Sequence, residues 1–216
     1  MKYFHNARDP WSSFTHLIGA GLAAVGTVVL LVFSFNVPLH RASAVASCLI
    51  FGCSMVALYG SSALYHYVKG TAEKIKKLRK LDHSMIYVLI AGTYTPVLLL
   101  AVGGKTGIIF TAVIWAMAFS GIFMKLCWLN APRWLYTSVY LLMGWAIVFY
   151  YPALKAISAL PLTFIAGGGV AYSVGAVIYI LKKPNICEGF GFHEIFHLLI
   201  MLGSALHFAA VFMLLF

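Results

Sequence analysis

Residues 17–37 read LIGAGLAAVGTVVLLVFSFNV and contain no charged side chain. A helix of about 20 such residues is long enough to cross the hydrocarbon core of a bilayer. The apolar core of a secretory signal peptide is shorter, at about 7–15 residues. We therefore interpret this run as the first membrane-spanning helix. A signal peptide cleaved near Ala42-Ser43-Ala44 is the alternative.

The composition of the whole chain agrees with this interpretation. Of its 216 residues, 62% are hydrophobic and only 9% are charged, whereas a soluble domain carries roughly 25% charged residues. A soluble enzyme, a disordered chain and a collagen-like fibre are thereby excluded. The net charge of +10 does not indicate nucleic acid, because membrane proteins collect Lys and Arg in their cytoplasmic loops. The four cysteines form no C-x-x-C motif and predict no disulfide framework.

Seven apolar stretches have the length of a membrane span. They cover residues 15–36, 43–67, 84–102, 107–129, 134–151, 160–181 and 193–215. Neither strand-length alternation nor regular hairpin spacing occurs, so the spans are helices rather than the strands of a barrel. The predicted fold class is therefore an all-α integral membrane protein, with residues 1–216 forming a single bundle of seven transmembrane helices.

The basic residues predict the orientation of this bundle. Seven helices place twelve Lys and Arg residues on the side of the N-terminus and three on the opposite side. Because basic residues accumulate on the cytoplasmic side, we expect a cytoplasmic N-terminus and an external C-terminus. Six of the twelve lie in residues 69–80. We interpret this segment as a cytoplasmic loop that contacts anionic lipid headgroups, with a lipid-sensing basic helix as the alternative.

This topology brings several polar side chains to one depth near the cytoplasmic face. They come from the end of the second span and from the starts of the first, third and seventh: His16, Ser62, His66, Asp82, His83, His193 and His197. Ionisable groups inside a membrane are energetically costly and mark functional sites. We therefore expect the functional site at this level.

Three of these histidines form a candidate zinc site. His193 and His197 are four residues apart and share one face of a helix, and His66 reaches the same depth from another helix. Imidazole suits zinc, and three histidines leave a fourth position for water, as in catalytic zinc sites. Asp82 can orient that water or accept its proton, and Ser62 lies one turn from His66. Buried histidines satisfied by ordinary hydrogen bonds are the alternative.

Residues 193–197 also match the H-E-x-x-H pattern of zinc metalloproteases, in which Glu is the general base. Such enzymes usually need a further acidic ligand, and the chain has no Asp or Glu after His197. We therefore interpret Glu194 as an interfacial residue, with an intramembrane protease as the alternative. His207 lies about 15 Å deeper than His197 by helix rise, so we expect it to bond a neighbouring helix. Pro96 predicts a kink in the third span.

These motifs together resemble the hemolysin III family. The matching segments are Ser62-Ala63-Leu64-Tyr65-His66, Leu81-Asp82-His83-Ser84, Ala91-Gly92-Thr93-Tyr94-Thr95-Pro96, His193 and His197 followed by Gly203-Ser204-Ala205-Leu206-His207-Phe208, and Thr15-His16 in the first span. They occur in the family's order over essentially the whole chain. The family is a bacterial branch related to the progestin and adipoQ receptors and, more distantly, to alkaline ceramidases.

The resemblance implies a role for each site residue. His66, His193 and His197 would be zinc ligands, Asp82 would hold the zinc-bound water, and Ser62 would lie beside the reacting carbonyl. The chain departs from the family pattern at two places. Glu194 stands where relatives commonly have a neutral residue, and Asp9 is the only candidate for the acidic residue that precedes the first-helix motif.

Three functions are compatible with the sequence. The first is a zinc-dependent hydrolase of lipid amide or ester bonds, near the cytoplasmic leaflet of the bacterial cytoplasmic membrane. The second is a non-enzymatic receptor-like or membrane-homeostasis protein with a structural zinc ion. The third is a hemolysin-type pore, which the family name suggests and the uniformly apolar spans disfavour. Ser62 and Asp82 separate the first two, because a structural zinc requires neither.

Overall fold

The computed structural model describes residues 6–37 and 40–216, and six of its helices are long and apolar enough to cross a membrane. They are α1 (Pro10–Ser34), α2 (Arg41–Tyr67), α3 (Ala72–Pro96) with its continuation η2 (Val97–Val102), α4 (Gly104–Cys127), α7 (Ala159–Leu181) and α8 (Phe192–Met213). Three shorter elements, α5 (Arg133–Gly144), η3 (Ala146–Phe149) and α6 (Tyr151–Ala156), lie between α4 and α7. The described residues form no strand, so the all-helical class is confirmed.

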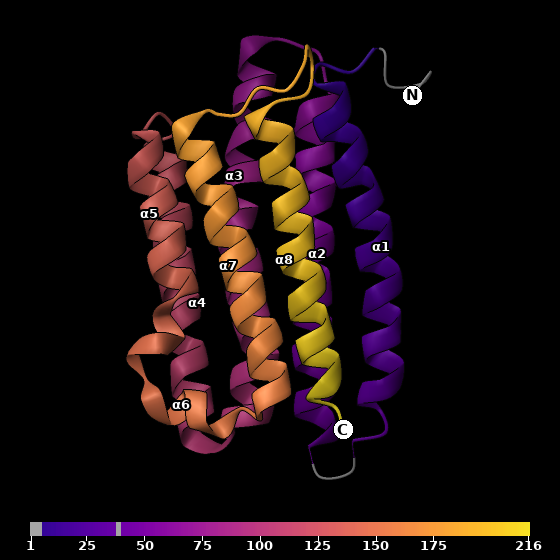
Figure 1. Cartoon of the computed structure of the whole chain (residues 1–216), viewed down its shortest axis with the longest axis vertical. Helices are drawn as coiled ribbons and strands as arrows, with labels where there is room; N and C mark the ends of the chain where they lie inside the picture. Colours follow the sequence, from indigo (N-terminus) through magenta and orange to yellow (C-terminus); the bar gives the residue numbers. More distant parts are fainter. Residues whose placement is uncertain (1–5, 38–39) are drawn as a thin grey trace.

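The long helices lie side by side along the long axis of the molecule (Figure 1). We call the end at which α1, α3 and α8 begin the polar end, and the opposite end the distal end. At the polar end the Asp9 N–H donates to the His66 carbonyl at 2.9 Å, which joins the start of α1 to the end of α2. The Lys80 Nζ donates to the Leu126 carbonyl at 2.5 Å, which joins α3 to the end of α4. Of the six long helices, α3 is the most buried.

The outer helices carry large apolar side chains on their exposed faces. Examples are Leu22, Val25, Val28 and Val32 on α1, Ile108, Ile109, Phe119 and Phe123 on α4, and Leu160, Val170, Val177 and Leu181 on α7. Soluble proteins rarely expose contiguous apolar surface on this scale. Together with the six apolar helices, these faces identify a multi-pass membrane protein.

The third span begins earlier than the sequence indicates. Residues 72–80 are the first turns of α3, so the loop predicted over residues 69–80 is wrong for most of its length. The Thr71 side chain accepts a hydrogen bond from the Lys74 N–H at 3.4 Å, and Lys77 pairs with Glu73 at 2.9 Å. A capping hydroxyl and an i,i+4 ion pair both favour helix. The basic segment therefore extends the helix at the polar end.

The predicted fifth span, residues 134–151, is divided among α5, η3 and α6. The cause is a side chain from α3. The Tyr94 hydroxyl donates to the Gly144 carbonyl at 2.7 Å and accepts from the Ile147 N–H at 3.1 Å. The Tyr94 hydroxyl thereby bonds a backbone carbonyl and a backbone N–H at the point where an α-helix would continue. Insertion of a side chain in this way interrupts the backbone hydrogen bonds of a helix. The expectation of one continuous helix is therefore wrong.

Pro96 perturbs α3 as the sequence predicts, although the form is a change of helix type. Proline has no N–H to donate to the Gly92 carbonyl, and the chain continues as the π-helix η2. Thr95 and Thr93 donate to the Ala91 and Leu89 carbonyls, each at 2.8 Å. Gly103 and Gly104 follow with φ of +65° and +56°, which glycine adopts without strain.

Four of the basic residues behind the orientation prediction can be compared with the structure. Lys125, counted with the loop between the fourth and fifth spans, lies inside α4 and is fully buried. Its Nζ lies 3.4 Å from the ring centroid of Tyr136, a cation–π contact. Lys2 lies outside the described residues. Arg133 and Arg79 belong to the starts of α5 and α3.

Candidate metal centre

The start of α8 is fixed by Glu194, in the middle of the H-E-x-x-H pattern. Its Oε2 accepts from the Gly191 N–H at 2.8 Å, and its Oε1 accepts from the Ser12 hydroxyl at 2.7 Å. The first bond caps α8, because the N–H groups that precede the first turn have no helical partner. The second bond joins α8 to α1. Both oxygens of Glu194 therefore hold the start of α8 in place.

His66, His193 and His197 meet between α2 and α8. They offer one ligand atom each, and these three atoms lie within 4.8 Å of one another. Nε2 of His66 and Nε2 of His193 are 3.2 Å apart. His66 and His197 are buried, and His193 is partly buried. Among the described residues, this is the group of His, Cys, Asp and Glu side chains that can hold a metal ion.

Asp9 fixes the orientation of His66. The Nδ1–H of His66 donates to Asp9 Oδ2 at 2.9 Å, and Arg8 Nε donates to the same oxygen at 2.9 Å. Burial alone would raise the pKa of the Asp9 carboxyl, but the hydrogen bonds from His66 and Arg8 and the positive charge of Arg8 lower it to about 2. Asp9 is therefore a carboxylate. With the proton of a neutral His66 on Nδ1, the Nε2 lone pair points to the cluster.

A carboxylate bonded to the remote nitrogen of a ligating histidine is the common supporting contact of metal sites. The sequence identified Asp9 only as the candidate acidic residue ahead of α1. Its partner was not apparent, because the contact joins residues 57 positions apart. The signal available was the position of Asp9 at the depth of His66.

His16 forms part of the wall of this cluster. It is buried, and its ring stacks on that of His197, with centroids 3.7 Å apart and planes 9° apart. It also contacts Tyr59 edge-on at 5.1 Å. The sequence places His16 at the right depth, and the structure shows that it packs against His197 while lying outside the group of three candidate ligands.

The other two predicted site residues, Ser62 and Asp82, are buried at the same end of the bundle. The Ser62 hydroxyl lies beside the Asp82 carboxyl, which also lies within electrostatic range of His66. Asp82 Oδ2 is 3.2 Å from Nδ1 of His83. Asp82 is not a member of the group of candidate ligands, but it lines the same cavity as His193 and His197.

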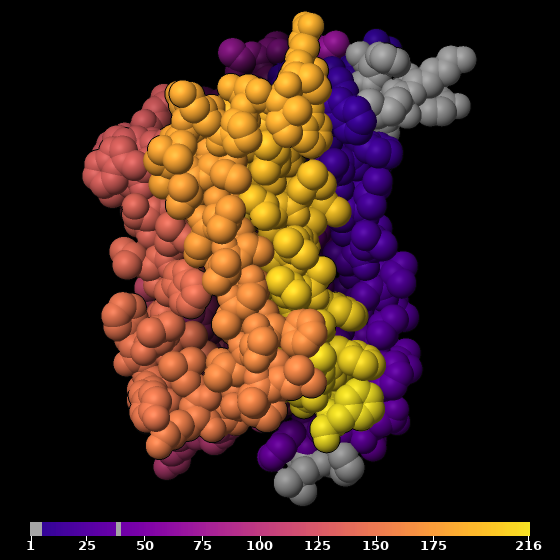
Figure 2. Space-filling view, in the orientation of Figure 1, coloured from indigo at the N-terminus to yellow at the C-terminus, as the bar shows by residue number. Residues whose placement is uncertain are grey.

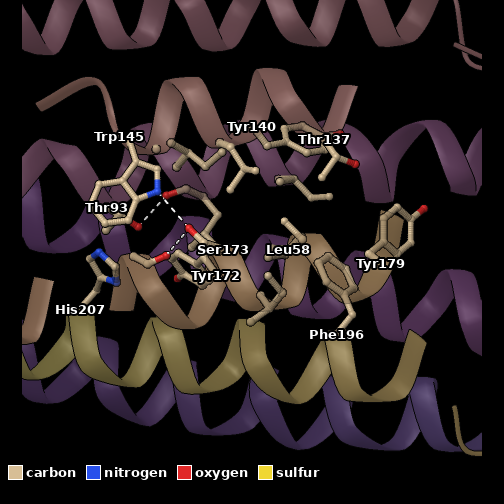
Figure 3. A pocket seen from close by; sticks show the side chains of 18 of the residues that line it. Leu58, Thr93, Thr137, Tyr140, Trp145, Tyr172, Ser173, Tyr179, Phe196 and His207 are labelled. Atoms are coloured by element: carbon tan, nitrogen blue, oxygen red, sulfur yellow. Dashed lines mark hydrogen bonds between the residues drawn. The ribbon is translucent and has the colours of Figure 1, made fainter. Parts of the chain in front are cut away.

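These residues open onto a cavity of about 380 Å³. His16, Ser62, Asp82, His193 and His197 line its polar end, and apolar side chains line most of the remainder. Figure 3 shows the cavity with Thr93, Trp145, Tyr172, Ser173 and His207 towards one end of it. The cavity therefore combines a candidate metal centre with an apolar space of lipid character.

The cavity reaches the side of the bundle between α7 and the α5–η3 segment. Val148, Leu154 and Leu162 belong to its lining, and α5 and α7 pack less closely than α7 and α8. Figure 2 shows a furrow between the α5–η3 segment and α7 on this side of the molecule. An opening here would face the hydrocarbon of a bilayer.

The spacing of one pair of these histidines is close to that expected on zinc. On a tetrahedral zinc with Zn–N distances of about 2.0–2.1 Å, two imidazole nitrogens lie about 3.3 Å apart, close to the 3.2 Å between His66 and His193. Imidazole nitrogen is a preferred zinc ligand, and structural zinc sites usually have four protein ligands. Three ligands beside a cavity match the open type of site.

His207 lies apart from the cluster, as the sequence predicts from its spacing. Its Nδ1–H donates to the Gly203 carbonyl of α8 at 2.8 Å, and its ring stacks on Tyr172 of α7 with centroids 5.3 Å apart. The contact with a neighbouring helix is therefore a ring stack, and the hydrogen bond stays within α8.

Comparisons with known proteins agree with the architecture and the motif order. A family model described as "Haemolysin-III related" matches residues 4–208. The chain is 38% identical over 202 residues to the "Hemolysin-3 homolog" of Bacillus subtilis (strain 168), covering 93% of this chain and 91% of the relative. It is 36% identical over 203 residues to "Hemolysin-3" of Bacillus cereus, covering 93% and 88%.

A more distant human protein extends the relationship beyond bacteria. The chain is 26% identical over 166 residues to the "Monocyte to macrophage differentiation factor" of Homo sapiens, covering 75% of this chain and 67% of the relative. The family match spans the first helix, His66, Asp82 and the histidine pair of α8. This chain is a membrane protein of the haemolysin-III related family.

Proposed function

We propose that the protein is a zinc-dependent hydrolase of lipid amide or ester bonds that works near the cytoplasmic leaflet of the bacterial cytoplasmic membrane. The observation that carries this proposal is the group of three histidines at the polar end of an apolar cavity, which His193 and His197 line together with a buried carboxylate and a hydroxyl. A site built only to join helices requires neither the cavity nor these two additional groups.

In this proposal His66, His193 and His197 hold the ion, and Asp9 keeps His66 in the required tautomer. When bound, zinc supplies Lewis acidity, which polarises a carbonyl and makes water acidic near neutral pH. Asp82 accepts a proton from the attacking water. With substrate bound, the Ser62 hydroxyl turns from Asp82 and donates its hydrogen bond to the carbonyl oxygen as negative charge develops on it. The apolar cavity holds the acyl chain and excludes bulk water.

The proposed orientation has a cytoplasmic N-terminus, an external C-terminus and seven crossings, with α5, η3 and α6 as the fifth. Arg133 at the start of α5 donates to the Tyr179 carbonyl near the end of α7 at 2.9 Å. Beyond the end of α5, Ile147 of η3 reaches Tyr94 near the end of α3. The segment therefore extends between the two ends of the bundle. The basic start of α3 would contact anionic headgroups.

A reporter fused after Phe216 checks this orientation. An external location agrees with it, and a cytoplasmic location contradicts it. A matched fusion within residues 69–71, ahead of α3, should report the cytoplasmic side.

A second candidate is a non-enzymatic protein in which zinc joins α2 and α8. It is favoured by the origin of the ligands, which come from two helices far apart in sequence. A pore-forming role, which the names of the Bacillus relatives bring to mind, draws no support from the apolar outer faces.

The experiment that separates these functions is a hydrolysis assay in detergent. Purified protein is incubated with a panel of lipid amides and esters, and released fatty acid is measured before chelation, after chelation and after zinc is restored. Release that disappears with the metal and returns with it supports the hydrolase. Zinc-bound, well-folded protein that releases nothing from the whole panel would favour the structural role.

A further inference from the structure

The distal part of the cavity contains a buried histidine that the proposed hydrolysis does not use. His207 is 7% exposed and lines the cavity. Its ring is held on two sides, because it stacks on Tyr172 with planes 13° apart and packs against Gly168 so closely that a Cβ there would overlap it. The orientation of the ring is therefore set by its packing.

The hydrogen bond of this ring fixes its tautomer. A carbonyl oxygen only accepts hydrogen bonds, so the Nδ1 that lies 2.8 Å from the Gly203 carbonyl carries the proton. The other nitrogen, Nε2, is then an acceptor in the neutral ring. Within the described residues Nε2 forms no hydrogen bond. Figure 3 shows the ring directed from α8 towards Thr93 and Trp145.

The neighbouring polar groups have already given their hydrogens to the protein. Thr93 donates to the Leu89 carbonyl at 2.8 Å, Trp145 Nε1 donates to the Ser173 hydroxyl at 2.9 Å, and Ser173 donates to the Gly169 carbonyl at 2.7 Å. The lone pairs of the Thr93 oxygen and of His207 Nε2 remain. This end of the cavity therefore offers hydrogen-bond acceptors and no free donor among these groups.

The acceptors lie about one acyl-chain length from the candidate metal centre. His207 is ten residues beyond His197 on α8, a rise of about 15 Å, and one leaflet of a bilayer has a hydrocarbon thickness of roughly 15 Å. Leu58, Ile90 and Ile200 belong to the lining along the way. A lipid with its scissile group at the histidine cluster would place the far end of its chain near His207.

We infer that His207 and Thr93 form a subsite for a hydroxyl group at the far end of the lipid chain, so that the preferred ligand is an ω-hydroxylated acyl lipid. A hydroxyl donates to the open lone pair of His207. A carboxylate or phosphate would face acceptors only, and a methyl would leave Nε2 without a partner. Because it names the lipid of the same cavity, this proposal rests on the proposed function, but binding tests it without turnover.

The test is displacement of the fluorescent fatty acid cis-parinaric acid from purified protein in detergent. The competitors are lauric and palmitic acids and the ω-hydroxy derivative of each. A single hydrogen bond typically changes an equilibrium by about two- to tenfold, so at least one ω-hydroxy acid should bind more tightly than its parent by this factor. Equal or weaker binding of both ω-hydroxy acids would overturn the subsite, as would the failure of all four to bind.

Two variants assign the preference to His207. His207→Phe keeps the aromatic stack on Tyr172 and removes the acceptor. The ratio of the affinities for the ω-hydroxy acid and its parent acid should then fall to about the ratio measured for the two acids with detergent alone. His207→Gln keeps a side-chain acceptor and should retain part of the ratio. Melting temperatures show whether each variant is folded. An unchanged ratio in folded His207→Phe would place the hydroxyl elsewhere, whereas zinc-dependent hydrolysis without any preference would leave the hydrolase standing and remove only the subsite.

Discussion

The two ends of the cavity use histidine on the same helix in opposite ways. At the polar end His197 of α8 meets the imidazoles of His66 and His193, with Asp9 behind His66. At the distal end His207 of α8 bonds a carbonyl of its own helix and stacks on one tyrosine. Both side chains are buried. Since the two residues are of the same type and both are buried, their neighbours decide which of them can hold a metal.

The difference shows how a metal site can be told from ordinary helix packing. A lone buried imidazole satisfies one nitrogen with a backbone carbonyl at small cost. Three imidazoles that face one another cannot all donate and accept productively, and a shared cation resolves the arrangement. The ends should therefore respond differently to substitution: changes at the polar end alter metal content or turnover, and changes at the distal end alter ligand preference.

The largest expected effect is the loss of metal from His66→Ala. Wild-type protein should contain close to one zinc ion per chain, and the variant should lose most of it, because one of three ligands and the contact to Asp9 disappear together. Zinc is measured by elemental analysis after purification without added metal. His40→Ala, an exposed histidine ahead of α2 at the distal end, is the matched control. Stoichiometric zinc in His66→Ala would refute the site.

Asp82→Asn should act on turnover more than on zinc. The amide keeps the size of the side chain but cannot accept the proton of the attacking water, and a general base typically contributes roughly 10²–10⁴-fold to the rate. Release of fatty acid from the best substrate of the panel should fall by that factor. Zinc content should remain near the wild-type value. Equal rates in the two proteins would remove Asp82 from the mechanism.

The sequence predicts five of the long helices within a few residues, because each is an uninterrupted apolar run with clear ends. It fails where another element or a surface interaction decides. Residues 72–80 are helical because Thr71 caps them, although their charge suggests a loop. The predicted fifth span is interrupted at Gly144, where Tyr94 of α3 bonds into it, and no feature of residues 134–151 alone shows that contact.

The candidate site was predictable to a similar extent and for a similar reason. The i,i+4 spacing of His193 and His197 lies in one helix, and the common depth of His66 and Asp82 follows from the topology. The pairing of Asp9 with His66 and the stacking of His16 on His197 depend on how α1 packs. Glu194 matched a protease pattern, and only its bonds to Gly191 and Ser12 show its role.

Asp9→Asn tests whether the carboxylate behind His66 supports the metal. The amide oxygen can still accept the Nδ1–H of His66, but the negative charge that favours the bond is lost. Loss of such a supporting contact typically weakens metal affinity by about 10–100-fold. Competition with a zinc chelator of known affinity measures the change. Glu73→Gln, which removes an exposed carboxylate paired with Lys77 at the same end, should leave the affinity unchanged. An unaltered affinity in Asp9→Asn would reduce its role to joining α1 and α2.

Glu194→Gln should have the smallest effect of the four. The amide oxygen can replace one carboxylate oxygen as an acceptor, from either Gly191 or Ser12, so the start of α8 is largely retained. The loss of negative charge at a helix N-terminus typically costs about 0.3–1 kcal/mol, which should appear as a slightly lower melting temperature. Zinc content and the rate of lipid hydrolysis should stay near wild type, because both carboxylate oxygens already serve the helix start. A fall in rate of roughly 10²–10⁴-fold at full zinc content would instead identify Glu194 as the general base. Glu194 would then have the role that Glu has in the H-E-x-x-H pattern, and Asp82 would have a supporting role.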